Sequence, residues 1–152
     1  NFFYTTFLGT RAEQMALGAS IGVPYDPSMG YIVVGMDFMA DPSEGLVPAN
    51  LEPAVGASAF VEGISGEGEA FVFAPLPIPG NEVYPHGSSF ITWPNREAGV
   101  SGSVIVKPAE GQQCVVSPAL GPNAVQGLQT VMAFADSVSV VSYICDQGAV
   151  PP

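Results

Sequence analysis

Apolar residues alternate with small or polar residues along much of this chain, and this period of two limits what the chain can fold into. In the clearest example, YIVVGMDFM at positions 31–39, Ile32 and Val34 fall on one side of an extended strand. Gly35 and Asp37 fall on the other side. Side chains alternate in this way across a β-strand, whereas a helix repeats about every 3.6 residues. The pattern therefore predicts β structure.

Short runs of the same kind recur along the chain, separated by glycine and proline. We expect further strands at 57–62, 69–74, 89–93, 102–107, 113–117 and 137–145, and interpret the ambiguous stretch 124–134 as a strand. No long helices stand between them, which argues against a parallel α/β fold. The sequence predicts an all-β, single-domain antiparallel sandwich, jelly roll or small barrel of about 7–8 strands.

One short helix is expected near the N-terminus. Thr10 and Glu13 have the spacing of a capping box, and Gly18 is placed to end the helix. This start divides the chain into an aromatic N-terminal arm, residues 1–9, and a single β domain, residues 10–152.

The N-terminal arm carries four aromatic side chains, namely Phe2, Phe3, Tyr4 and Phe7. Its residues 2–8 are β-prone and contain no charge, glycine or proline. An extended peptide of this kind can join a sheet edge through main-chain hydrogen bonds while its side chains enter pockets. We expect the arm to pack against a neighbouring subunit or a partner surface. The alternative is an ordinary first strand on its own sheet.

Three prolines at alternate positions follow the strand predicted at 69–74. Pro75, Pro77 and Pro79 lack the backbone N–H that other residues donate to a neighbouring strand. Successive N–H groups of an extended chain point to opposite sides, so these prolines remove donors along one side only. Since proline within sheets is confined to edges and strand ends, we interpret the segment as a blocked strand edge that leads into a stiff loop. The alternative is that the prolines only stiffen a long loop.

The charge composition argues for a subunit of an assembly. Charged residues make up 11% of the chain, and 14 carboxylates against 3 cations give a net charge of −11. Because typical domains carry about 25% charged residues, apolar surface must remain here, and such surface marks contact with other molecules. We expect homo-oligomers, with copies of the chain and another structural protein as partners. The shortage of Lys and Arg argues against nucleic acid, and the short apolar runs argue against membrane insertion.

Cys114 and Cys145 are the two cysteines, each inside a predicted strand. They form either a disulfide or two buried free thiols, and spacing alone does not decide between these. If they are bonded, we expect the disulfide to join two strands across the core and to close a loop of about 30 residues.

No set of residues predicts catalysis. The single histidine, His86, has Ser88 and Ser89 nearby in sequence but no nucleophile motif, so we predict that the protein is not an enzyme. No cofactor is predicted. Calcium is the metal with the best match, because carboxylates gather in two segments: Asp37, Asp41 and Glu44, and Glu62, Glu67 and Glu69. Solvated loop acids are the simpler interpretation of both.

Together these features favour a structural assembly subunit on a virion surface or in the extracellular space. Examples of this class are a capsid-decorating (cement) protein and a subunit of an extracellular filament or shell. The alternative is a secreted or surface-exposed β-sandwich binding or adhesion module. Tyr84, Phe90 and Trp93 lie close together in sequence, and aromatic side chains exposed on a β-sandwich can stack on sugar rings. This alternative therefore includes carbohydrate binding.

Overall fold

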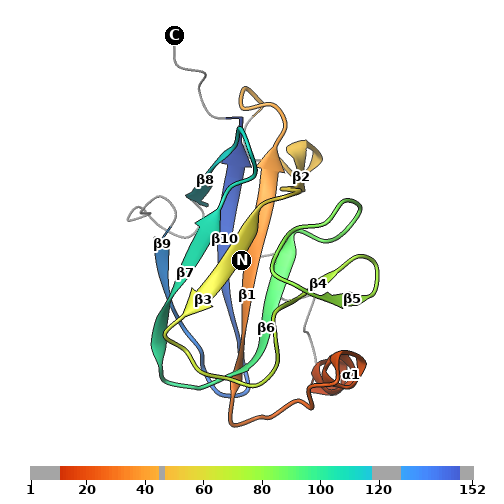
Figure 1. Ribbon diagram of the computed structural model, residues 1–152, viewed down its shortest axis with the longest axis vertical. Helices are drawn as coiled ribbons and strands as arrows, with labels where there is room; N and C mark the ends of the chain where they lie inside the picture. Colours follow the sequence, from red (N-terminus) through yellow and green to blue (C-terminus); the bar gives the residue numbers. More distant parts are fainter. Residues whose placement is uncertain (1–10, 45–46, 118–127, 148–152) are drawn as a thin grey trace.

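Two β-sheets packed face to face make up the fold of this chain (Figure 1). The structure is a computed structural model that describes residues 11–44, 47–117 and 128–147. Its elements are α1 (Arg11–Ile21), β1 (Gly30–Met39), η1 (Pro48–Asn50), β2 (Leu51–Pro53), β3 (Ser58–Glu62), β4 (Phe71–Phe73), β5 (Pro77–Pro79), β6 (Phe90–Arg96), β7 (Ser101–Lys107), β8 (Gln113–Val116), β9 (Leu128–Met132) and β10 (Val138–Asp146). The predicted all-β sandwich is confirmed, and neither sheet closes into a barrel.

Sheet A is the larger sheet and sheet B the smaller. In sheet A the strands follow the order β5-β4-β6-β1-β10-β8, and the short strand β2 pairs with the end of β1. Sheet B has the order β3-β7-β9. The chain therefore changes sheet several times, as expected for a sandwich.

The central pair of sheet A, β1 and β10, is parallel, which corrects the expectation of a purely antiparallel sandwich. The pairing runs from Tyr31 opposite Val138 to Phe38 opposite Cys145. Both strands begin at the same end of the sheet, where the Ser137 carbonyl accepts from the Tyr31 N–H. The other strand pairs of the described residues are antiparallel.

The hydrophobic core lies between the two sheets. It is made by the alternate residues that the period of two assigns to one face, with Ile32 and Val34 of β1 at 0% exposure. The facing side chains of sheet B include Val104 and Val106. Tyr143 of β10 spans the interior, and its hydroxyl donates to the Val104 carbonyl at 3.5 Å.

The helix ends later than predicted, at Ile21 and not at Gly18. The ending glycine is Gly22, which has a φ of 72°. The Gly22 N–H donates to Ala19 O and the Val23 N–H to Gly18 O, the paired hydrogen bonds of a Schellman motif. Gly18 has another reason to be glycine, since a Cβ there would lie 2.6 Å from the Val23 carbonyl oxygen. Two glycines near a helix end gave two candidates, and the sequence pattern selected the wrong one.

Two short strands were not predicted, and one of them corrects the interpretation of the prolines. Pro77–Pro79 forms β5, which pairs antiparallel with β4, so this segment continues sheet A where a stiff loop was expected. The other strand, β2, has three residues. Neither segment has a run long enough for the period of two to show, so hydrophobic patterning carried no signal for either.

Candidate interaction surfaces

The edge of sheet A at β5 has its backbone donors removed on the outward side. The Ala74 N–H donates to Leu76 O and the Gly80 N–H donates to Ala70 O, so even-numbered residues of this segment hydrogen-bond toward β4. By alternation, Pro77 and Pro79 turn their backbone nitrogens to the free side. Pro75 precedes the strand in the turn from β4. An incoming strand therefore finds no N–H donor at Pro77 or Pro79.

Beyond β5 the chain crosses from sheet A to sheet B at Gly80. Residues 81–83 pair with the outer edge of β3, where the Ala59 N–H donates to Asn81 O and the Val83 N–H donates to Ala57 O. Gly80 has a φ of 151°, a conformation that side-chain-bearing residues rarely adopt. This crossing closes the β3 edge as far as Ala59. By alternation, the backbone of the next outward-facing residue, Val61, lies beyond the crossing.

A groove of about 410 Å³ opens at this corner, next to Val61. Trp93 and Ala70 contribute apolar surface to it, while Glu62, Glu69 and Arg96 contribute charge. Two carboxylates and one guanidinium around apolar surface offer both acceptors and donors to a ligand. We call this surface the corner groove.

Arg96 makes no ion pair with another described residue. Arg11 forms an ion pair with Asp136 at 3.3 Å, and the Lys107 ammonium lies 4.9 Å from the centroid of the Phe60 ring. Arg96 donates from Nη2 to Gly68 O, but its Nε is buried without a hydrogen-bond partner. Burial lowers the pKa of this guanidinium. Arg96 therefore lines the corner groove with a guanidinium whose Nε is buried and lacks an acceptor.

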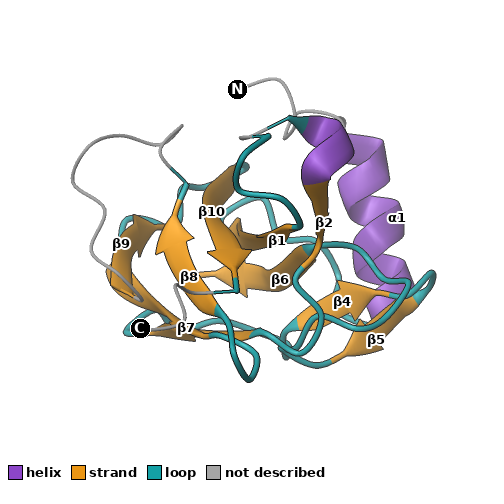
Figure 2. Cartoon of the chain, turned by 90° about the horizontal axis from the view of Figure 1, so that it is seen from above, coloured by secondary structure: helices purple, strands orange, loops and turns teal. Residues whose placement is uncertain are grey.

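The outward-facing side of sheet A is also apolar. We define the outer face of sheet A as the side of β1, β6 and β10 turned away from sheet B, with Val33, Thr92, Val140 and Ile144 among its residues. In Figure 2, α1 lies beside β4 and β5, at one flank of this sheet. Within the described residues, sheet B packs on the inner face of β1 and β10 only.

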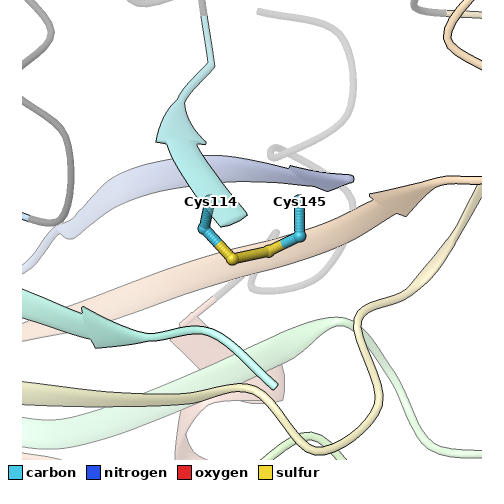
Figure 3. The surroundings of a disulfide bond; sticks show 2 residues. All are labelled: Cys114 and Cys145. Atoms are coloured by element: carbon cyan, nitrogen blue, oxygen red, sulfur yellow. A yellow bond between two sulfur atoms is a disulfide. The ribbon is translucent and has the colours of Figure 1, made fainter. Parts of the chain in front are cut away.

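The cysteines form a disulfide, but they do not bridge the core as predicted (Figure 3). Cys114 of β8 and Cys145 of β10 are directly opposed on neighbouring strands of sheet A, with a Cα–Cα distance of 4.0 Å. Both side chains point into the core. The prediction failed because a sequence does not show which strands are neighbours. Disulfides persist in oxidising compartments, so the bond favours an extracellular or surface location.

The two acidic segments weighed as calcium sites do not assemble into one in the described residues, where no group of three potential ligands is present. Asp41 is exposed, and its pKa is lowered by hydrogen bonds from the Ser43 hydroxyl and N–H. Asp37 is half-buried, and desolvation raises its pKa against a hydrogen bond from Ser89. Glu62 and Glu69 both line the corner groove, whereas Glu67 does not.

The residues weighed for catalysis and sugar binding are also dispersed. His86 is an exposed turn residue with a φ of 61°, and the Ser88 hydroxyl donates to Phe90 O and not to the imidazole. Trp93 points into the core side of β6 at 7% exposure, while Tyr84 is 37% exposed in a loop. The structure therefore does not gather the three aromatics, and the absence of enzymatic activity stays a prediction.

The aromatic arm residues Phe2, Phe3, Tyr4 and Phe7 lie outside the described residues. The described part of the chain contains no helix with the length and apolar character of a membrane span.

Comparison with known proteins identifies no family. No family model and no curated protein matches the chain. Solved structures that are similar in part include the major pilin from Streptococcus pyogenes, with a TM-score of 0.46 and 10% identity over 79% of this chain and 48% of the pilin. They also include a pilus-presented adhesin, with a TM-score of 0.45 and 11% identity over 80% of this chain and 28% of the adhesin. The chain spans about half of the pilin's length. At these scores the likeness carries no argument about function.

Proposed function

We propose that this protein is a structural subunit of an extracellular assembly, such as a surface filament or shell or the decorating layer of a virion. Copies of the chain associate with one another and with a second structural protein. The proposal includes no catalytic role, because no set of residues in the sequence predicts one.

The observation that carries the proposal is a contrast within sheet A. Its β5 edge is closed to strand pairing by Pro77 and Pro79, while its outer face presents apolar side chains to which sheet B contributes no contact. Proteins close an edge when uncontrolled pairing is a hazard. A weakly charged chain that closes this edge is suited to associating in a single, defined way, and we assign that contact to the layer that covers the outer face.

The aromatic arm is the segment that we assign to the contact between copies. Its residues Phe2, Phe3, Tyr4 and Phe7 reach a neighbouring subunit, and the uncharged arm avoids the repulsion that two chains of net charge −11 otherwise experience.

Light scattering coupled to size-exclusion chromatography tests the proposal directly. We expect the full chain to form oligomers whose mass increases with concentration from the micromolar to the submillimolar range. The disulfide must stay oxidised during the measurement, which a thiol count on the unfolded protein verifies. A chain that stays monomeric at every concentration, with and without salt to screen its charge, contradicts the proposal.

A binding or adhesion module is the second candidate function, and the corner groove is the observation that favours it. Its apolar surface from Trp93 and its donors and acceptors from Arg96, Glu62 and Glu69 match a neutral polyhydroxylated ligand, since both charge signs are present. A glycan array with the wild type and with Glu69→Gln tests this function. Selective retention that the substitution weakens supports the module, whereas equal binding by both proteins opposes it.

A further inference from the structure

The outer face of sheet A is organised in rows that cross several strands. Strand register places Phe71 of β4, Thr92 of β6, Val33 of β1 and Val140 of β10 in one continuous row. The next row contains Phe90, Gly35 and Ser142. A third contains Asp37 and Ile144. The first two rows have no charged side chain, so the centre of this face is suited to an apolar partner.

Two described segments reach this face at its borders. At the β4 flank, Ile21 and Val23 line a small cavity together with Phe71. At the end of the sheet where β1 begins, the Tyr25 ring meets the Tyr31 ring edge-on at 6.0 Å between centroids. Between these borders, Val33 and Ile144 are each 8% exposed, although sheet B packs on the opposite side of their strands. The outer face is therefore covered within the chain itself, as one layer of a sheet that is packed on both sides.

The position of α1 determines which segment can form that layer. Arg11, the first described residue, is tied by its ion pair to Asp136, and the Asp136 N–H donates to Met29 O just before β1. The chain that precedes Arg11 therefore starts at the end of sheet A where β1 and β10 both begin. Ten extended residues reach at most about 33 to 36 Å. This matches the length of β1, which has 10 residues.

We propose that the outer face of sheet A is the binding surface for residues 2–8 of the aromatic arm, and that in the assembly it is filled by the arm of a second copy. This proposal rests on the proposed function. Arm exchange reuses the same contacts within or between chains and is a low-cost route to association. The sequence places Gly9 between the arm and the helix, where glycine permits the change of direction.

Photo-crosslinking of the full chain identifies both the surface and the source of the arm. Tyr4 is replaced by p-benzoylphenylalanine in a ¹⁵N-labelled chain, which is mixed with unlabelled wild type before irradiation. We expect crosslinks from the labelled arm to unlabelled peptides that contain residues 90–96 or 138–146. Crosslinks only within labelled chains identify the chain's own arm and overturn the exchange. Crosslinks to other peptides, such as 101–107 of sheet B, overturn the binding surface.

A pair of matched substitutions provides an independent test. Val140→Lys places a charge in the first row of the outer face of sheet A, at a half-buried position of β10. Ile105→Lys is the control, because Ile105 is also half-buried in a central strand but lies on the outer face of sheet B. We expect Val140→Lys to weaken association at least tenfold by light scattering and Ile105→Lys to change it less than threefold. Circular dichroism melting verifies that both variants are folded.

The outcomes separate this inference from the proposed function. If the wild type is monomeric, the proposed function fails and the exchange fails with it. If the wild type assembles and both substitutions affect assembly equally, the protein remains an assembly subunit but the outer face of sheet A is not the arm's binding surface.

Discussion

The two faces of sheet A come from the same strands, yet they differ in their residues and in what they contact. The inner face presents Ile32, Val34 and Tyr143, which pack against sheet B with no exposed surface. The outer face interleaves apolar residues with Gly35 and Asp37. The inner face is therefore a uniformly apolar core, whereas the outer face mixes apolar side chains with small residues and one ionisable residue.

The difference indicates that fold and association are assigned to opposite sides of the same strands. Side chains alternate along β1, so substitutions at neighbouring positions probe different properties of the protein. Inner-face substitutions are expected to lower the free energy of unfolding, and outer-face substitutions to change association. The predictions below test this division, from the largest expected effect to the smallest.

The largest effect is expected when inner-face volume is removed. Ile32→Ala leaves a cavity between the sheets, and such substitutions cost about 2 to 5 kcal/mol of unfolding free energy. Val140→Ala on the outer face removes less buried surface and is expected to cost about 1 kcal/mol or less. Urea denaturation of both variants at a concentration where the chain is monomeric measures the contrast. Equal losses would show that the two faces contribute alike to the fold.

The disulfide also belongs to the inner face, since Cys114 and Cys145 both contact the core. The bond closes a loop with a sequence separation of 31, for which chain entropy predicts a contribution of about 3 to 4 kcal/mol. Reductant should therefore lower the melting temperature by roughly 6 to 16 °C. The control is Cys114→Ser with Cys145→Ser, which should melt low with or without reductant. A wild type whose melting does not respond to reductant contradicts this prediction.

The alternation of side chains allowed most of this architecture to be predicted. Every run with a period of two became a strand, including the ambiguous stretch, which contributes β9 at 128–132. Pattern did not reveal the partners of these strands. The parallel pairing of β1 with β10, and the position of Cys114 opposite Cys145, depend on contacts between residues that are distant in sequence.

Of the candidate surfaces, only the β5 edge could be predicted from the sequence, because it depends on the backbone N–H groups that proline lacks. Proline lacks a donor in any context, so Pro77 and Pro79 indicated an edge before their strand was known. The corner groove had no such signal. It brings Val61 next to Trp93 because the chain changes sheets at Gly80, and a glycine between proline and asparagine predicts a turn without indicating where it leads.

The third prediction concerns an ionisable group of the inner face. Burial raises the pKa of Tyr143 from 10.0 to about 12. The unfolded chain therefore ionises first as the pH rises above about 10, and the stability that the neutral phenol provides is lost between the two values. Tyr143→Phe should remove this part of the alkaline loss, which is about 1.4 kcal/mol at pH 11, where the unfolded phenol is mostly ionised and the folded phenol mostly neutral. Urea midpoints at pH 8 and pH 11 measure it, and parallel declines in both proteins contradict the prediction.

The smallest effect is expected from the outer face, at Asp37. Desolvation raises its folded pKa above 3.8, so protonation favours the folded state, and that stabilisation disappears as the pH rises through the folded pKa. At pH 7 the half-buried carboxylate therefore costs stability, and Asp37→Asn should raise the urea midpoint slightly, with the gain vanishing below about pH 4. Asp41→Asn is the control of opposite sign. Hydrogen bonds from Ser43 lower the pKa of Asp41, so its substitution should lower the midpoint at pH 7. If Asp37→Asn also lowers the urea midpoint at pH 7, the carboxylate makes a contact that stabilises the folded chain. The charge of Asp37 is then compensated within the chain, without a partner.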